Sequence, residues 1–372
     1  MTRRTHQPSR DTMQPPSQNI PSRSIRFLSV AFALLVGLLL LPLPSSRAAQ
    51  QTAAAPVAAP PTPLYQYWRT GNPQNTRAVP QGGFALLGGG TDLDAAFVWL
   101  CHQAHGGDLL VLRARGTDAY NPYIHDLCHN NSDATLVIPS RKVAFDPAVQ
   151  KKIAAAHAIF IAGGDQAKYV NFWQNTPVQR AINNAIRRGV PLGGTSAGLA
   201  VQGEFMYSSQ NDPDDDSELE SPAALQNPYT ARVTIVHNFL HIPALRDTIT
   251  DSHFGNRDRM GRLLVFLARI LQSGNVKTIH AIAIDQHTAV LLQPDGHGSV
   301  IGTGAAYFLK ASSKASVCRP GTPLTFAGVS VVKLTAGDRF NTAAWTGTGG
   351  LPYQLSVVNG TIHSTQPGGK IY

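Results

Sequence analysis

One hydroxyl, that of Ser196, stands among residues with almost no side chain in the stretch RGVPLGGTSAGLAV. The apolar run 189–192 before it is typical of a buried strand, and the small residues 197–201 after it are typical of a buried helix. Three glycines around it permit tight turns and close backbone approach. A sharp strand-to-helix turn exposes the residue at its tip to free helix N–H groups. Ser196 is therefore predicted to be the nucleophile of an elbow, and the alternative is a glycine-rich turn with a serine N-cap.

A serine nucleophile needs a base, and His253 is the best histidine candidate. It precedes an apolar pattern at helical spacing over 263–271, so the sequence predicts that it lies in a loop entering a helix. Arg257, Arg259 and Arg262 crowd the first turns of that helix, where the helix dipole disfavours cations. Either an anionic ligand compensates for this cost, or the three are solvated surface arginines beside a capping loop.

The elements that must position these groups alternate between strands and helices. The predicted strands cover 84–87, 108–113, 135–139 and 158–162, and a predicted helix covers 176–188. This alternation predicts a parallel sheet covered on both faces, with ligands beyond the carboxyl ends of its strands. Gly88–Gly90, Gly163–Gln166 and Gly194–Ser196 all follow predicted strands, which places a candidate site at one sheet edge. After about residue 312 the chain is richer in Gly, Thr and Val and predicts further strands.

The first 48 residues differ in kind from the rest. A basic flank, an apolar run from Phe27 to Leu41 and small residues up to Ala48 predict a secretory signal cleaved near Ala48. An uncleaved N-terminal anchor is the alternative. Residues 49–64 are rich in Ala and Pro and predict a linker. We therefore expect a secreted or periplasmic protein with no stable membrane span after cleavage, an α/β domain over 65–311 and a β-rich extension over 312–372.

Charge and residue content indicate which partners, cofactors and disulfides to expect. The formal net charge is +9, but residues 1–48 contribute +5 from six Arg and one Asp, which leaves +4. No run of Lys and Arg indicates a nucleic-acid partner, and scattered histidines without CxxC or HExxH spacing give no support for a metal or another cofactor. In an exported protein we expect Cys101 to pair with Cys128. The sequence leaves open whether the chain is a monomer or a homodimer.

Four motifs stand in one order between about residues 80 and 310. They are GGDQ at 163–166, GGTSAG at 193–198, DSHF at 251–254 followed by RDRMGRL at 257–263, and IAIDQHTAV at 282–290. Together they resemble the S51 family of serine peptidases, which includes cyanophycinase and dipeptidase E. The resemblance implies a class I glutamine-amidotransferase-like α/β fold, a three-layer sandwich with a mostly parallel sheet. It also implies cleavage of peptides that hold aspartyl units, and cyanophycinase releases β-aspartyl-arginine from cyanophycin.

The resemblance also implies a role for each matching residue. The implied catalytic residues are Ser196 as the nucleophile, His253 as its base and Gln286 at the third position. The implied substrate-binding residues are Gln166, Asp251, Arg257, Arg259 and Arg262, the arginines holding substrate carboxylates. The implied oxyanion donors are backbone N–H groups around Gly164 and Ala197.

Two departures from the family's pattern affect the catalytic set. The family usually has Gln where this chain has Ser252, and an acid where it has Gln286. A neutral amide orients the base without offsetting the charge of its imidazolium, and loss of the acid from a triad lowers the rate severely without erasing it. The candidate substitutes for the acid are Glu204, Glu218, Glu220, Asp251 and Asp285. The acidic run 212–220 is interpreted as a solvated loop, and the alternative is that it meets a guanidinium of the substrate.

Two classes of function remain open. The first is a secreted or periplasmic serine exopeptidase of the cyanophycinase type, whose partner is a peptide with acidic groups. The second is a peptide-binding pseudoenzyme on the same scaffold, its catalytic set eroded at Gln286. An amidotransferase-like enzyme is a weaker third alternative, because those enzymes use Cys at the elbow and this chain has Ser196.

Overall fold

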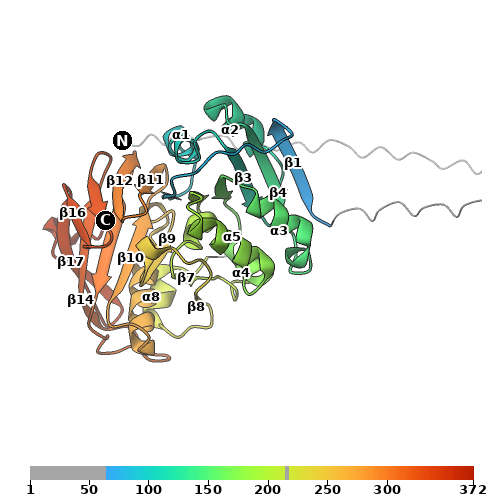
Figure 1. Cartoon of the computed structure of the whole chain (residues 1–372). Coiled ribbons are helices and arrows are strands. Elements are labelled where there is room, and N and C mark those ends of the chain that lie inside the picture. The colour runs from blue at the N-terminus through green and yellow to red at the C-terminus, as the bar shows by residue number, and fades with distance from the viewer. Residues whose placement is uncertain (1–63, 214–217) are drawn as a thin grey trace, which may run out of the picture. The chain divides into compact units, whose positions relative to one another are not determined.

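The computed structural model describes residues 64–213 and 218–372, whose strands form two sheets (Figure 1). In spatial order the first sheet consists of β1 (Gln66–Gly71), β4 (Ser132–Val137), β3 (Asp108–Arg113), β5 (Ala158–Ile161), β6 (Leu192–Thr195), β2 (Phe84–Leu87), β11 (Thr288–Leu292), β12 (His297–Gly302), β15 (Arg339–Asn341) and β16 (Thr346–Thr348). The five strands from β4 to β2 are parallel, and the outer strands pair antiparallel. The predicted signal and all but the last residue of the predicted linker lie outside the described residues.

The second sheet is largely antiparallel. In spatial order it consists of β18 (Thr361–Ser364), β17 (Leu351–Val358), β14 (Phe326–Leu334), β13 (Ala306–Ala311), β10 (Ile279–Ile284), β9 (Thr248–Asp251), β7 (Phe205–Tyr207) and β8 (Ile235–His237). Among the described strands of this sheet, the parallel pairs are β9 with β10 and β9 with β7. The β-rich region predicted after residue 312 is confirmed, and its strands extend both sheets.

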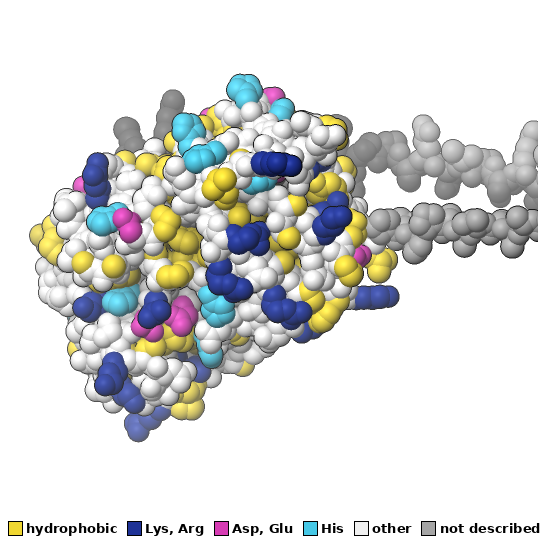
Figure 2. All heavy atoms as spheres, viewed as in Figure 1, with side chains coloured by type: hydrophobic (Ala, Val, Ile, Leu, Met, Phe, Trp, Pro, Cys, Tyr) yellow, Lys and Arg dark blue, Asp and Glu magenta, His cyan; other side chains and the backbone are white. Residues whose placement is uncertain are grey.

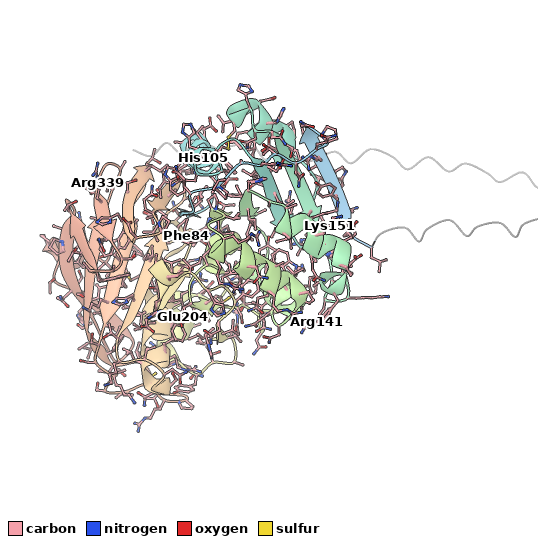
Figure 3. The ribbon with its side chains drawn as sticks, in the orientation of Figure 1. Phe84, His105, Arg141, Lys151, Glu204 and Arg339 are labelled. Atoms are coloured by element: carbon pink, nitrogen blue, oxygen red, sulfur yellow. A yellow bond between two sulfur atoms is a disulfide. The ribbon has the colours of Figure 1, made fainter. Side chains whose placement is uncertain are left out.

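Helices cover the parallel part of the first sheet on both faces. They are α1 (Asp94–Gln103), α2 (Tyr120–Cys128), α3 (Pro147–Ala154), α4 (Gln166–Trp173), α5 (Pro177–Arg187) and α6 (Ala197–Ala200), whereas α7 (Ser221–Gln226) and α8 (Met260–Ser273) pack with the second sheet. Successive strand residues point to opposite faces. In β2, Ala85 and Leu87 therefore pack with α1 and α2, whereas Phe84 (Figure 3) and Leu86 share a core with α3, α4 and α5. This arrangement confirms the predicted three-layer α/β fold.

The central strands of the second sheet, β9 and β10, are buried on both faces by the same alternation. In β10, Ile282 and Ile284 join the core that contains α3 to α5, whereas Ala281 and Ala283 pack with α8. The carboxyl end of β9 and the turn after β10 lie close to the carboxyl ends of the parallel strands. Both sheets contribute residues to that edge.

The strand before Ser196 differs from the prediction. It was expected over 189–192, but β6 spans Leu192–Thr195 and includes Gly193 and Gly194. A Cβ on Gly193 would lie 2.8 Å from Phe160, and one on Gly194 would lie 2.4 Å from a backbone oxygen. These glycines therefore permit close packing within a strand, and they do not make the turn.

A disulfide joins α1 to α2 in the outer helical layer. It links Cys101 to Cys128, which confirms the predicted pairing, and Cys318 is buried and free. We expect Cys128→Ser to lower the free energy of unfolding by about 3 kcal/mol, because the bond restricts the unfolded chain over a loop of 27 residues. Equilibrium denaturation in urea measures the loss. Cys318→Ser is the control and should cost less than about 1 kcal/mol; equal losses would show that the bond itself adds nothing.

The described residues were compared with two patterns, a membrane-spanning helix and a cluster of metal ligands. Within 64–213 and 218–372 no helix has both the length and the apolar character to cross a membrane, and no three His, Cys, Asp or Glu side chains cluster as metal ligands. Lys and Arg side chains are dispersed over the face shown in Figure 2.

Candidate active site

Ser196 lies in the turn between β6 and α6, at the carboxyl ends of the parallel strands. Its φ of 54° and ψ of −114° are rare for a residue with a side chain and cost on the order of 1–3 kcal/mol. The turn is held tightly: the Ser196 N–H donates to Leu87 O at 3.1 Å, and a Cβ on Gly198 would lie 1.9 Å from Ile161 O. This strained strand–turn–helix has the geometry of a nucleophile elbow.

His253 follows β9 and reaches the serine from the second sheet. Its Nε2 lies 2.7 Å from Ser196 Oγ, which is hydrogen-bond distance. The backbone has a φ of 47°, and its N–H donates to Gly88 O at 2.7 Å. A Cβ on Gly89 would lie 2.4 Å from the imidazole, so this position must lack a side chain for the ring to fit.

Gln286 completes a chain of three side chains from the turn between β10 and β11. Its Nε2 lies 2.8 Å from His253 Nδ1. If His253 Nε2 is to accept the serine proton, Nδ1 must carry a hydrogen, and Gln286 must then present Oε1 to it. A half-turn of the amide exchanges its two ends, so Gln286 is able to fix the required tautomer. It supplies no negative charge.

In the part of the chain that the structure describes, no carboxylate takes the place of the missing acid. Among the described residues none of the five candidates bonds to His253. Asp285 accepts two backbone N–H groups, at 2.7 and 3.1 Å, and Glu204, labelled in Figure 3, accepts another at 2.6 Å. Glu220 precedes α7. Glu218 binds Arg257, and Asp251 binds Arg262.

The environment keeps His253 neutral. Burial is the main cause that lowers its pKa to about 4; Arg259 and Arg262 lower the pKa further, and Asp251 opposes them. At neutral pH the imidazole is therefore free to accept a proton. The imidazolium that forms on proton transfer is disfavoured by the same burial and the same positive charges, and Gln286 does not offset them.

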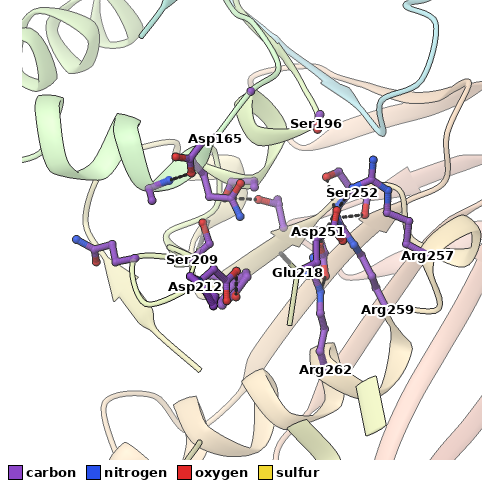
Figure 4. A pocket seen from close by; sticks show the side chains of 18 residues that line it. Asp165, Ser196, Ser209, Asp212, Glu218, Asp251, Ser252, Arg257, Arg259 and Arg262 are labelled. Atoms are coloured by element: carbon purple, nitrogen blue, oxygen red, sulfur yellow. Dashed lines mark hydrogen bonds and ion pairs between the residues drawn. The ribbon is translucent and has the colours of Figure 1, made fainter. Parts of the chain in front are cut away.

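A pocket of about 560 Å³ opens beside Ser196 (Figure 4). Gln166 and Gly164, from the segment after β5, line it as predicted. In the described part of the chain, neither the Gly164 N–H nor the Ala197 N–H donates to a backbone carbonyl. Both remain available as donors to an oxyanion formed next to Ser196.

The predicted arginines line the same pocket, but they contact carboxylates of the chain itself (Figure 4). Arg262 binds Asp251 with two contacts, Nε to Oδ2 at 3.0 Å and Nη2 to Oδ1 at 2.5 Å. Arg259 donates to Ser252 O at 2.7 Å and to Glu218, and Arg257 binds Glu218 as well. Three guanidiniums thus face two carboxylates, so this cluster keeps one net positive charge.

Asp251 is ionised despite its burial. Desolvation raises the pKa of its carboxyl, but the charges of Arg262 and Arg259 outweigh that cost and hold the pKa below its usual range. Because both partners are buried, removing either one would leave an uncompensated charge. The Arg262–Asp251 pair is therefore part of the rigid wall of the pocket.

The interpretation of the acidic run as a solvated loop is wrong for Asp212, whose side chain is only 6% exposed. Asp212 lines the pocket, accepts the Tyr207 hydroxyl at 2.6 Å and binds Arg232 Nε at 2.7 Å. Glu218 lines it from the other end of the run. Composition alone gave no sign of which acids of the run face inward, because that depends on contacts between distant segments.

Sequence comparison finds a known peptidase family over the part of the chain that contains this site. The model of peptidase family S51 matches residues 140–296, which contain Ser196, His253 and Gln286. The chain is 28% identical over 211 residues to the cyanophycinase of Trichormus variabilis, covering 55% of this chain and 64% of that protein. It is 31% identical over 202 residues to the cyanophycinase of Geminocystis herdmanii, covering 53% and 66%. The match to these two cyanophycinases spans just under two thirds of their own length.

Two solved structures resemble this chain more distantly. A peptidase from an acI-B1 actinobacterium aligns with a TM-score of 0.45 and 18% identity, over 71% of this chain and 98% of that one. A putative peptidase E from Listeria monocytogenes aligns with a TM-score of 0.39 and 13% identity, over 60% and 99%. Likeness at this level carries no information about substrate.

Proposed function

We propose that this protein is a serine-type hydrolase of the cyanophycinase type, an exopeptidase in which Ser196 is the nucleophile and His253 its base. The observation that carries the proposal is the 2.7 Å contact between Ser196 Oγ and His253 Nε2 at a strained elbow beside a pocket. A general base must lie within hydrogen-bond reach of the proton that it removes, and this one does.

The geometry supports a two-step acyl transfer. Ser196 Oγ attacks the scissile carbonyl carbon while His253 Nε2 takes the hydroxyl proton. The N–H groups of Gly164 and Ala197 bind the negative oxygen that forms. His253 then gives its proton to the leaving amine as the C–N bond breaks. Water attacks the acyl-serine by the same route, and His253 returns the proton to Ser196.

The charges in the pocket favour a substrate with a carboxylate, such as an aspartyl peptide. The Arg262 side chain is only 3% exposed and donates two hydrogen bonds to Asp251, so we assign it to the wall of the pocket. Arg257 is 42% exposed, and its partner Glu218 is 34% exposed, so this pair is accessible to a ligand. A substrate carboxylate that displaces Glu218 would bind Arg257 and Arg259 together.

Replacing Glu218 tests this exchange. We expect Glu218→Gln to lower KM for aspartyl peptides by on the order of tenfold, because the internal competitor loses its charge while its amide still contacts the arginines. KM for a neutral ester should stay the same. Steady-state kinetics on both substrates measures the two KM values. A thermal melt checks that the fold tolerates the loss of the negative charge beside Arg259. A KM for aspartyl peptides that rises, or that moves together with the ester, would contradict the exchange.

Export is a separate proposal. Two features suit a secreted or periplasmic protein. One is the basic flank and apolar run before Ala48, and the other is the Cys101–Cys128 bond. N-terminal sequencing of the protein recovered from the medium or periplasm should begin near Ala49. An intact Met1 or Met13 on the protein would refute cleavage at that site.

The alternative function is a peptide-binding pseudoenzyme, which the neutral Gln286 beside His253 favours. Incubation of purified protein with β-aspartyl and α-aspartyl peptides distinguishes the two functions. Release of amino acids or dipeptides by the native protein, and none by Ser196→Ala, supports the hydrolase. Saturable binding with equal, background-level release by both proteins supports the pseudoenzyme.

A further inference from the structure

The turn that carries the base is strained and short. His253 has a φ of 47° and Asp258 also has a φ of 47°, and a single 3₁₀ turn, Gly255–Arg257, separates them. α8 begins immediately afterwards at Met260. Conformations of this kind persist only where the surroundings over-determine them. Something must therefore hold this turn in place.

Tyr372 contacts the turn at three points. Its hydroxyl donates to Asp258 Oδ1 at 2.8 Å and accepts the Met260 N–H at 2.8 Å. Its ring lies edge-on to Phe254, the residue after the base, with centroids 5.7 Å apart at 76°. A Cβ on Gly255 would lie 3.5 Å from the same ring. The Met260 N–H is one of the N–H groups that a helix start leaves without an internal partner, so the hydroxyl satisfies a real requirement.

The segment that carries Tyr372 is itself fixed to the second sheet. Ile371 O accepts the hydroxyl of Tyr353 in β17 at 3.0 Å, and Lys370 O accepts Gln366 Nε2 at 2.8 Å. The Tyr372 ring also meets Tyr307 of β13 edge-on, with centroids 5.9 Å apart. Tyr372 therefore holds the turn in a fixed position relative to the second sheet.

We propose that Tyr372 is a positioning residue that holds the imidazole of His253 against Ser196. The role rests on the proposed function. Phe254 links the two residues: its side chain is fully buried against the Tyr372 ring, and its backbone follows the base directly. Without the hydroxyl, Asp258 and Met260 lose their shared partner and the turn is free to relax. A small displacement of the base is costly, because proton transfer needs close alignment and about 1 Å of misplacement costs on the order of a hundredfold in rate.

Tyr372→Phe is the variant that tests this role, because it keeps the ring and removes only the hydroxyl. We expect the rate of Ser196 labelling by a fluorophosphonate, and kcat for a neutral ester, to fall by on the order of tenfold, with KM unchanged. The control is Tyr123→Phe, which removes a similar hydroxyl-to-carboxylate bond, to Asp94 at 2.6 Å, far from the turn along the chain. The control should label at the native rate. Both variants are assayed well below their melting temperatures.

A second variant keeps the test decisive if Tyr372→Phe folds poorly. Asp258→Gly removes the same bond from the exposed side, and glycine accepts the positive φ without strain. It should slow labelling to a similar extent, and the double variant should be no slower than either single one. Native rates in the variants, equal losses in Tyr123→Phe, or additive losses in the double variant would each overturn the role while leaving the hydrolase intact. A native protein that is not labelled would refute the proposed function and this role together.

Discussion

His253→Ala is expected to slow acylation of Ser196 by on the order of 10⁴-fold or more, because no other side chain takes the serine proton. Among the described residues His253 provides the only ring nitrogen bonded to Ser196 Oγ. The measurement is the pre-steady-state rate of labelling or of ester cleavage. Loss of the ring should leave the fold intact, since the partly exposed Gln286 is the other side chain that it binds.

The matched control is His287→Ala. His287 also has a positive φ, of 54°, and follows Gln286 directly, but its side chain is exposed and makes no contact with Ser196. Its removal should change the rate by less than about threefold. A loss of similar size in both variants would mean that this region needs its histidines for structure and that His253 is not the base.

Gln286→Glu is expected to increase the rate on the order of ten- to a hundredfold. A carboxylate at this position accepts the Nδ1–H of His253 and stabilises the imidazolium, which the native amide does not. The 2.8 Å contact in the native chain shows that the two side chains already meet. Steady-state kinetics on a neutral ester measures the gain, and Gln286→Leu, which neither orients nor charges the ring, should fall below the native rate.

The same substitution should move the acid limb of the pH profile. In the native protein the pKa of His253 is lowered to about 4, so activity should rise as the pH passes through about 4 and stay level up to neutral pH. A nearby carboxylate favours the protonated ring and raises this pKa. Gln286→Glu should therefore lose activity at a higher pH than the native protein on acidification. An acid limb that stays in place, together with an unchanged rate, would contradict the role given to Gln286.

Local sequence patterns were enough to predict that the site residues lie close together. Ser196 and Gln166 follow predicted parallel strands, and the carboxyl ends of such strands meet at one edge. The loop of His253 precedes a helix whose apolar spacing is unambiguous, and the order of the four motifs added the third position, Gln286. For Ser196, Gln166 and His253 the sequence within ten or so residues contained the signal, whereas Gln286 came from the family resemblance.

The pairing of charges was not predictable. Arg262 was expected to hold a substrate, yet it is neutralised by Asp251, and nothing in the spacing showed which carboxylate would close on which guanidinium. Glu218 and Tyr372 reach the turn of His253 from segments far away along the chain. Such contacts depend on how the two sheets pack, and single-sequence patterns do not encode that directly.

Reaction of Ser196 with a fluorophosphonate tests the central claim most directly, because this probe forms its bond only with a serine that a base has activated. Purified native protein is treated with the probe at pH 7, digested and analysed by mass spectrometry. The account predicts one adduct, on the peptide that contains Ser196, formed within minutes and absent from His253→Ala. A native protein that stays unlabelled, or labels at the same rate without His253, would contradict it.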